Sequence, residues 1–398
     1  MVFRVEGGLY GDPRAGRWWM NTLAAWLTQN EGFTRSSIDP SLYTRCMGTE
    51  EEIMMTIHCD DSMVQGQDDT HVQQFMTAMN KRWGDCGFEP ASWILGMNVI
   101  QNDEGIWIGH STFVDQMLDK LELTRLKPES TPFPPGATVD KRECPEIPDE
   151  KRVKQMQQIV GALTWLSCQS RPDISWAVSQ LARVTSNPSV GHLQLAKHVC
   201  AYVASTRSRG IQYFRQIESK LKLITYCDSG WSDIPGGVGD TLASNPDGRK
   251  SSEGYIAMLA GGPVAWQSHK SDCVSLSSCE AELVASVRAG KCMKFMRNLL
   301  HDLGEVQRQP SPLFMDNLSA VLINNTEGHL SQRTRHIDNR WFWIQTEVAE
   351  HRIYVFHCPG SPTVAGLGNP SDMLTKALPM PRHWFYADAV TSRAPDRV

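Results

Sequence analysis

Asp228 is the acid around which the chemical signals of this sequence can be arranged. It follows the run Leu221–Cys227, whose β-branched and aromatic residues predict a buried strand that leads into an Asp-Ser-Gly turn. Asp316 likewise follows a short apolar run and precedes a helical pattern, and Glu282 and Asp372 stand in segments that could reach the same place. Because strand ends and helix starts meet at one edge of an α/β sheet, we expect these four carboxylates to converge.

Four carboxylates at one edge require a cation. Two of them about 4 Å apart repel each other by roughly 4 kcal/mol at an effective dielectric of 20, and they would take up protons unless a cation neutralised them. Oxygen-only ligands of high charge suit Mg²⁺ or Mn²⁺, and two such ions can hold the attacking and the leaving oxygen of a phosphodiester. The pattern therefore predicts a metal-dependent nuclease.

The helix predicted to begin at Ser277 separates two neighbouring acids. Ser277 and Glu280 have the spacing of a capping box, in which the two residues satisfy free backbone N–H groups at a helix start. Glu282 lies roughly 200° around the helix from Glu280, so both cannot point at one metal cluster. We assign Glu282 to the metal site and Glu280 to the helix start.

A second pair of acids, Asp60 and Asp61, lies at a predicted tight turn. The apolar strand Ile53–Cys59 precedes the turn, and a return strand begins after it at Met63. Palm-type polymerases present metal ligands as adjacent acids in such a strand-turn-strand arrangement. The alternative interpretation is the solvated tip of a hairpin, because two adjacent aspartates are common.

Composition places the 398-residue chain with ordinary globular proteins, since 41% of its residues are hydrophobic and 21% are charged. No apolar run approaches the roughly 18 to 20 residues that a membrane span needs, and the first residues lack the apolar core of a signal peptide. The 11 cysteines include no C-x-x-C pair, so they indicate neither a zinc site nor a disulfide framework. We expect a protein of the cytoplasm, or one enclosed in a particle, without a membrane partner.

The middle of the chain is basic, although the whole chain carries a formal charge of −5. Residues 151–215 contain nine Lys or Arg against one acid, which leaves +8, and their apolar spacing predicts helices. Such helices can follow a phosphate backbone with little sequence preference. The predicted nucleic-acid contacts are Lys151, Arg152, Lys154, Arg171, Lys197, Arg207 and Arg209, joined by Arg333 and Arg335 of a later basic segment.

Changes in composition divide the chain into domains. Six prolines between residues 128 and 148 predict a stiff, extended linker, and the basic helical segment ends near residue 216. The expected order is a first domain of residues 1–127, a linker of residues 128–150, a helical module of residues 151–215, an α/β domain of residues 216–385 and a tail of residues 386–398.

Eleven strings occur in the order found in one protein family, among them GLYGDPRAGRWW, IHCDD, ILGMNVI, YCDSGW, MDNLSA and NPSDMLTKALP. On these strings the chain resembles the C-terminal part of a copia-type retrotransposon Pol polyprotein, namely reverse transcriptase followed by RNase H. The resemblance covers almost the whole chain. It implies an α/β and α+β multidomain fold with a truncated reverse-transcriptase palm, a helical thumb or connection, and an RNase H-like α/β domain with a mixed five-stranded sheet.

The resemblance also implies roles for single residues. Asp60 and Asp61 match the paired metal ligands of the polymerase palm. The four acidic ligands that hold two Mg²⁺ ions, or Mn²⁺, in RNase H match Asp228, Glu282, Asp316 and Asp372. The implied substrate is an RNA–DNA hybrid, whose RNA strand is marked by its 2′-OH. The implied surroundings are a virus-like particle and the upstream part of Pol.

Three departures from the family pattern shape the expected function. His58 and Cys59 stand where the family has an aromatic and a small apolar residue, and Ser361–Thr363 replace a histidine ahead of the last acid. The third palm aspartate and the fingers would lie before Met1. We therefore expect hydrolysis of the RNA strand of hybrids. The alternatives are a reverse transcriptase that needs a separate upstream half, an inactive relic that binds nucleic acid, and a general phosphohydrolase for small esters.

Overall fold

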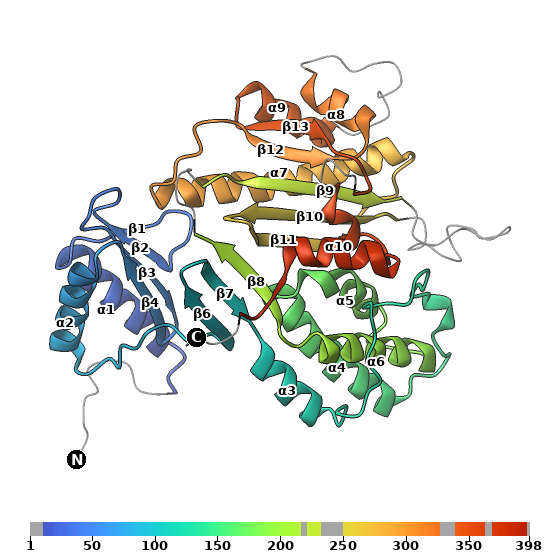
Figure 1. Ribbon diagram of the computed structural model, residues 1–398, viewed down its shortest axis with the longest axis horizontal. Coiled ribbons are helices and arrows are strands. Elements are labelled where there is room, and N and C mark those ends of the chain that lie inside the picture. Colours follow the sequence, from blue (N-terminus) through green and yellow to red (C-terminus); the bar gives the residue numbers. More distant parts are fainter. Residues whose placement is uncertain (1–10, 216–220, 232–249, 327–338, 363–367, 396–398) are drawn as a thin grey trace. The chain divides into compact units, whose positions relative to one another are not determined.

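The computed structural model of the protein describes residues 11–215, 221–231, 250–326, 339–362 and 368–395. The chain divides into two compact units: unit 1 comprises Met1–Leu95 and Phe295–Gln307, and unit 2 comprises Gly96–Lys294 and Arg308–Val398. Each unit combines helices with β-sheet (Figure 1). The fold is therefore mixed α/β, as the sequence predicts.

Unit 1 is an antiparallel four-stranded sheet with two helices packed against one of its faces. Along its strand β3, buried and more exposed residues alternate, because Leu27 of the first helix and Phe75 of the second pack against one side. The hairpin predicted around Asp60 and Asp61 is present as β3 and β4. In chain order the elements are α1 (Ala15–Gln29), β1 (Thr34–Arg35), β2 (Leu42–Arg45), β3 (Ile53–His58), β4 (Asp61–Gly66) and α2 (Asp69–Trp83).

The first sheet of unit 2 is mixed, with five strands in the order β11-β10-β9-β12-β13. Strands β9, β10 and β11 pair antiparallel, whereas β12 runs parallel to both β9 and β13. The bounds of these strands are β9 (Ile224–Gly230), β10 (Ser252–Leu259), β11 (Gly262–Lys270), β12 (Ser311–Met315) and β13 (Ile353–His357).

Helices pack on both faces of this sheet. Gly290 of the long helix α7 approaches β13 and α9 so closely that a Cβ atom there would lie 2.3 Å from Ile344 Cδ1. On the other face, Leu374 and Tyr386 of two C-terminal helices form a core with Ile256 of β10. The helices are α7 (Ser278–Asp302), α8 (Leu318–Asn325), η4 (Asn339–Phe342), α9 (Trp343–Ala349), η5 (Pro370–Leu374) and α10 (Met380–Val390).

The remainder of unit 2 joins a second sheet to a group of helices. Within unit 2 this sheet has the order β14-β8-β7-β6, and the helices share one apolar core that includes Leu163, Ile174 and Val199. The elements are β6 (Met97–Asn102), β7 (Gly105–Gly109), α3 (Ser111–Lys120), η1 (Lys141–Glu143), α4 (Glu150–Gln169), η2 (Pro172–Ile174), α5 (Ser175–Ala182), α6 (Val190–Ser205), β8 (Arg209–Phe214) and β14 (Ser392–Arg393). The two-residue strand β5 (Trp93–Ile94) belongs to the residues of unit 1.

The units divide the chain differently from the domains expected from the sequence. The first segment of unit 1 ends at Leu95 rather than at residue 127, because β7 of the following hairpin pairs with β8 of unit 2. Strand β8 in turn lies inside the segment 151–215 that the sequence analysis treats as helical. The proline-rich segment is not a free linker, since Phe133 and Val139 are buried in the helical core and the ring of Phe133 lies 5.4 Å from that of Trp176. Within the described ranges, no helix is long and apolar enough to cross a membrane.

Candidate metal centre and nucleic-acid contacts

Three of the four acids predicted from the sequence lie together at one edge of the first sheet of unit 2. Asp228 lies near the end of β9, Asp316 directly follows β12, and Asp372 lies in η5. Strands β9 and β12 are parallel neighbours in which Leu313 pairs with Thr225. Asp228 lies three residues after Thr225 and Asp316 lies three residues after Leu313, so the two acids are at the same level of the sheet. Among the described residues, one oxygen from each of the three carboxylates lies within 4.8 Å of the other two.

Glu282 projects from α7 toward the same edge but lies outside that group of three. Its Oε1 accepts a hydrogen bond from the backbone N–H of Ser229 at 3.2 Å, and the residue is 4% exposed. Its Oε2 is buried and has no hydrogen-bond partner in the described part of the chain. We use the name acidic cluster for Asp228, Glu282, Asp316 and Asp372.

Glu280 has the helix-start role that the sequence predicts. Its backbone N–H donates to Ser277 Oγ at 3.1 Å, and its Oε2 accepts from the backbone N–H of Leu276 at 2.7 Å. In an ideal capping box the glutamate would accept from the backbone N–H of Ser277, whereas here Glu280 accepts from that of the preceding residue, Leu276. Glu280 therefore stabilises the start of α7, whereas the side chain of Glu282 belongs to the acidic cluster.

Members of the acidic cluster disfavour one another's ionised form. Burial raises the pKa of Glu282 well above its ordinary value, and the charges of Asp228 and Asp316 raise it further. Burial, followed by the charge of Asp228, also raises the pKa of Asp316. Buried carboxyls with raised pKa values at one sheet edge mark a candidate functional site.

Asn369 positions Asp372, a role that sequence analysis missed. The Asn369 side chain caps η5 by accepting from the backbone N–H of Ser371 at 3.2 Å, while its Nδ2 donates to the carbonyl of Cys227 in β9 at 2.8 Å. The short helix is thereby tied to the strand that carries Asp228. The Asn-Pro pair at the start of this helix is the signal that could have identified the cap.

Two cations reach into the acidic cluster, and sequence analysis missed both. Lys376 Nζ lies 2.6 Å from Asp372 Oδ1 and 3.8 Å from Asp228 Oδ2. The guanidinium of Arg382 in α10 donates to Asp372 Oδ2 and to the carbonyl of Gly360. Lys376 stands four residues after Asp372, a spacing at which side chains on one helical turn meet, so this contact had a sequence signal. Arg382 comes from the next helix and had none.

The residues at this edge fit a divalent cation. The donor set consists of carboxylate oxygens alone, which suits Mg²⁺ or Mn²⁺. Glu282 Oε2, buried without a hydrogen-bond partner among the described residues, is the kind of orphaned acceptor that a metal ion would satisfy. The acidic cluster is therefore our candidate metal centre.

Asp60 and Asp61 form a separate and exposed pair in unit 1. Asp60 lies in the turn between β3 and β4, and Asp61 begins β4; in the same turn Cys59 adopts a φ of 55°, a region that non-glycine residues seldom occupy. Asp61 lines a cavity of about 230 Å³ together with Asp39 and His58. In the described part of the chain, no third metal-binding side chain comes as close to this pair as Asp228, Asp316 and Asp372 come to one another.

Two predicted nucleic-acid contacts are wrong because their charges are used inside the protein. Arg171 is 1% exposed and forms an ion pair with Asp173 at 2.8 Å. Arg209 is 5% exposed and donates to Asp388 at 2.7 Å and to the carbonyl of Thr391 at 2.9 Å. Neither guanidinium can reach a phosphate without breaking these bonds.

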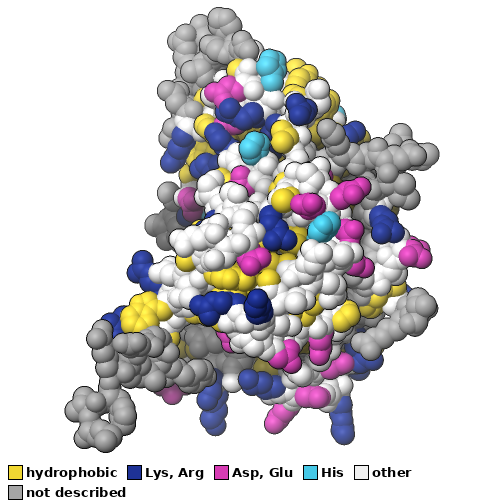
Figure 2. All heavy atoms as spheres, turned by 90° about the vertical axis from the view of Figure 1, so that its left-hand side faces the viewer, with side chains coloured by type: hydrophobic (Ala, Val, Ile, Leu, Met, Phe, Trp, Pro, Cys, Tyr) yellow, Lys and Arg dark blue, Asp and Glu magenta, His cyan; other side chains and the backbone are white. Residues whose placement is uncertain are grey.

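The other predicted contacts remain open to solvent to different degrees. Lys151 and Lys154 are exposed on α4, Lys197 is half-buried on α6, and Arg207 is exposed in an ion pair with Asp115 at 3.2 Å. Arg152 bonds to Asp149 and to the carbonyl of Pro188, and Arg333 and Arg335 lie outside the described residues. On the face shown in Figure 2, Lys and Arg side chains of the described residues are interspersed with Asp and Glu side chains.

Comparisons with known proteins match the chain to retrotransposon proteins. Residues 1–135 match the family model for reverse transcriptase (RNA-dependent DNA polymerase). The chain is 28% identical over 386 residues to the retrovirus-related Pol polyprotein from transposon TNT 1-94 of Nicotiana tabacum, and 28% identical over 378 residues to that from transposon RE1 of Arabidopsis thaliana. The putative transposon Ty5-1 protein of Saccharomyces cerevisiae is 27% identical over 290 residues, which are 72% of this chain and 87% of the relative.

The coverage of these alignments is unequal. Each alignment with the two plant polyproteins covers 95% of this chain but only 27% or 24% of the relative, so the chain spans about a quarter of their length. The similarity reaches beyond the reverse-transcriptase segment and confirms the resemblance drawn from the sequence strings. The chain is thus similar to the Pol proteins of copia-type retrotransposons, and its residues 1–135 match the reverse-transcriptase family model.

Proposed function

We propose that the chain cleaves the RNA strand of RNA–DNA hybrids by metal-dependent hydrolysis. The observation that carries the proposal is the acidic cluster, in which oxygens of Asp228, Asp316 and Asp372 lie within 4.8 Å of one another beside the orphaned Oε2 of Glu282. Two Mg²⁺ or Mn²⁺ ions bound there would activate a water molecule and stabilise the leaving 3′ oxygen of a phosphodiester.

The chain's own residues would hold and orient this centre. Asp228 and Asp372 would be ligands from elements that Asn369 ties together, and the N–H of Ser229 would fix the rotamer of Glu282. The exposed Lys151 and Lys154 would bind phosphates of the hybrid without reading its sequence.

The mixed sheet supports the domain assignment that belongs to this proposal. Its five strands bear or directly precede two of the four acids, and the helices packed on it bear the other two. We assign the mixed sheet and the helices packed on it, expected within residues 216–385, to an RNase H-like domain, the helices of residues 151–215 to a thumb or connection, and unit 1 to a reverse-transcriptase palm. The proposed partners are an RNA–DNA hybrid and the upstream part of Pol.

Cleavage of a labelled RNA–DNA hybrid in Mg²⁺ or Mn²⁺ tests the proposal, with RNA–RNA and DNA–DNA duplexes as controls. We expect only the hybrid to be cut. Asp228→Asn should lower the rate by more than about 100-fold, since even outer partners of metal ligands typically cost 10- to 100-fold. Asp103→Asn, which makes the same change in the exposed turn between β6 and β7, should leave the rate unaltered. Hybrid that binds but remains uncut with either metal would identify an inactive relic.

RNA-directed DNA synthesis is the second candidate function, favoured by the reverse-transcriptase match and by the adjacent acids Asp60 and Asp61, of which Asp61 lines a cavity. Primer extension tests it, with the chain alone and mixed with an upstream segment of Pol. Under this candidate function we expect synthesis in the mixture, and its loss in Asp61→Asn. No extension in any such mixture would remove this candidate and leave hybrid cleavage unaffected.

A further inference from the structure

The acidic cluster already contains cations of its own. Its four carboxylates face Lys376 and Arg382, so full ionisation would leave a formal charge of minus two. Lys376 lowers the pKa of Glu282 and of Asp316, although burial and the neighbouring acids outweigh this effect. The ammonium group therefore interacts with every acid of the cluster, either through a contact or through its field.

The two cations are held in different ways. Arg382 is anchored, because its guanidinium also donates to the carbonyl of Gly360 and lies 5.8 Å from the ring centroid of Tyr386. Lys376 is held by carboxylates alone, and its side chain is 45% exposed. A compact ammonium on a flexible four-carbon stem can leave such a position at little steric cost.

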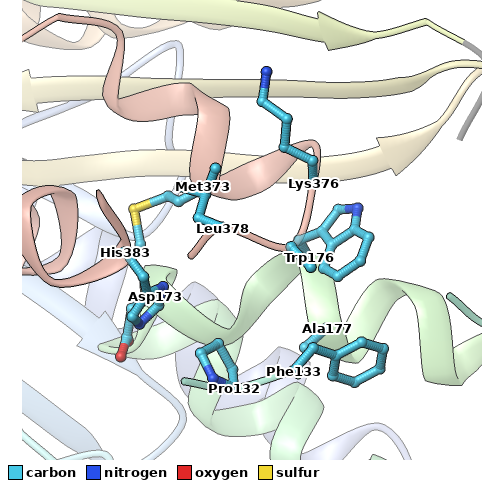
Figure 3. Close-up of a pocket in the computed structure, with 10 residues that line it drawn as sticks. Pro132, Phe133, Asp173, Trp176, Ala177, Met373, Lys376, Leu378 and His383 are labelled. Carbon is cyan, nitrogen blue, oxygen red and sulfur yellow. The ribbon is translucent and has the colours of Figure 1, made fainter. Parts of the chain in front are cut away.

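The position of the ammonium overlaps with that of a metal ion. A Mg²⁺ ion that binds Asp228 and Asp372 would lie about 2.1 Å from an oxygen of each. Lys376 Nζ lies 2.6 and 3.8 Å from oxygens of these same residues, so ammonium and metal cannot both occupy this space. Figure 3 shows the side chain of Lys376 pointing toward the strands of the sheet and away from Phe133 and Trp176.

We propose that Lys376 is a built-in competitor of the metal. Its ammonium neutralises Asp228 and Asp372 when no divalent cation is bound, and metal binding displaces it toward solvent. Lys376 thereby weakens metal binding and stabilises the metal-free fold. This inference rests on the proposed function only in that the acidic cluster binds a divalent cation.

The test is the dissociation constant of Mn²⁺ for the full chain without nucleic acid at low ionic strength, measured by isothermal titration calorimetry. Lys376→Gln should bind Mn²⁺ about tenfold more tightly than the unchanged protein, whereas Lys376→Arg, which keeps the charge, should not. Lys291→Gln removes the same charge from an exposed position on α7 and should match the unchanged protein. In EDTA, Lys376→Gln should also melt at a lower temperature, and Mn²⁺ should raise its melting temperature more.

Two contrary results are distinguishable. If Asp228→Asn abolishes Mn²⁺ binding but Lys376→Gln binds Mn²⁺ as weakly as the unchanged protein or more weakly, the competitor role is overturned and the metal centre stands. If the unchanged protein shows no Mn²⁺ binding that depends on Asp228, the metal centre fails and the competitor role fails with it.

Discussion

Unit 2 contains two groups of charged residues that differ in how completely their charges are neutralised. In the group that we name the buried network, every charge has a partner: Arg171 makes two bonds of 2.8 Å to the two oxygens of Asp173, Tyr202 donates to Asp173 at 2.7 Å, and the hydroxyl of Tyr202 lies 2.9 Å from His383 Nε2. In the acidic cluster, four acids share two cations, and the buried Oε2 of Glu282 has no hydrogen-bond partner among the described residues.

The pKa directions record this difference. Burial favours the neutral form of Asp173, but the charge and hydrogen bonds of Arg171 outweigh it and hold the pKa of Asp173 at about 2. For Glu282 and Asp316, burial and neighbouring acids act in the same direction and raise the pKa. A buried charge that is fully partnered is structural, whereas carboxylates gathered with too little counter-charge mark a candidate functional site.

Removal of a buried charge should therefore have opposite effects in the two groups. Asp173→Asn leaves Arg171 buried without its counter-ion, so we expect the free energy of unfolding to fall by about 3 kcal/mol or more. Asp228→Asn relieves repulsion, so in EDTA it should leave this free energy unchanged or raise it. Denaturant unfolding at neutral pH measures both. Equal losses in the two variants would show that the groups do not differ in this way.

A second prediction concerns the pH dependence that the buried network confers. Burial lowers the pKa of His383 to about 4, compared with 6.5 as its ordinary value. Between these two values the unfolded chain binds a proton that the folded chain does not, so stability falls as the pH drops from 6.5 toward 4. The expected loss is about 3 kcal/mol, because each pKa unit corresponds to roughly 1.4 kcal/mol.

His383→Gln should remove this contribution and flatten the stability profile in that window. The difference between variant and unchanged protein is the quantity to measure, because burial also lowers the pKa of His110 to about 4 and adds a similar slope to both. Parallel profiles for the two proteins would mean that His383 accepts its proton in the folded state as readily as in the unfolded state.

The smallest effect on stability is expected from an exposed charge pair. Arg207 and Asp115 are both mostly exposed, so breaking their ion pair with Arg207→Gln should cost less than about 1 kcal/mol. If Arg207 also contacts a phosphate, the salt dependence of hybrid binding should lose about one unit of slope. Asp115→Asn breaks the same pair but keeps the cation, so its hybrid binding should not weaken. Equal weakening in both variants would argue for a structural role.

The convergence of the acids could be predicted from the sequence because it follows from local patterns. Asp228 and Asp316 end runs that are recognisable as strands, and the capping spacing around Glu280 left Glu282 for the site. The burial and ion pairing of Arg171 and Arg209 could not be predicted from local patterns. Arg209 is neutralised by Asp388, 179 residues away, so a count of charge along the chain treats it as free. Arg171 has its partner two residues on, but burial decides its role, and burial depends on the packing of the whole helical core.

The packing of the proline-rich segment, residues 128–148, could not be predicted from the sequence either. Its prolines restrict the backbone, and from the sequence they predict an extended linker between domains. Phe133 within it is buried against Trp176 of α5 because the helical core leaves a space of its size. An apolar residue in a polar, proline-rich stretch was the available signal, whereas its packing partner lies more than forty residues later.

Anomalous diffraction from crystals soaked in Mn²⁺ would test the central claim, that the acidic cluster is a metal centre, most directly. We expect a peak about 2.0 to 2.3 Å from oxygens of Asp228 and Asp372, with the ammonium of Lys376 moved away from both. The absence of a peak there at saturating Mn²⁺, or a peak only at the turn of Asp60 and Asp61, would contradict it.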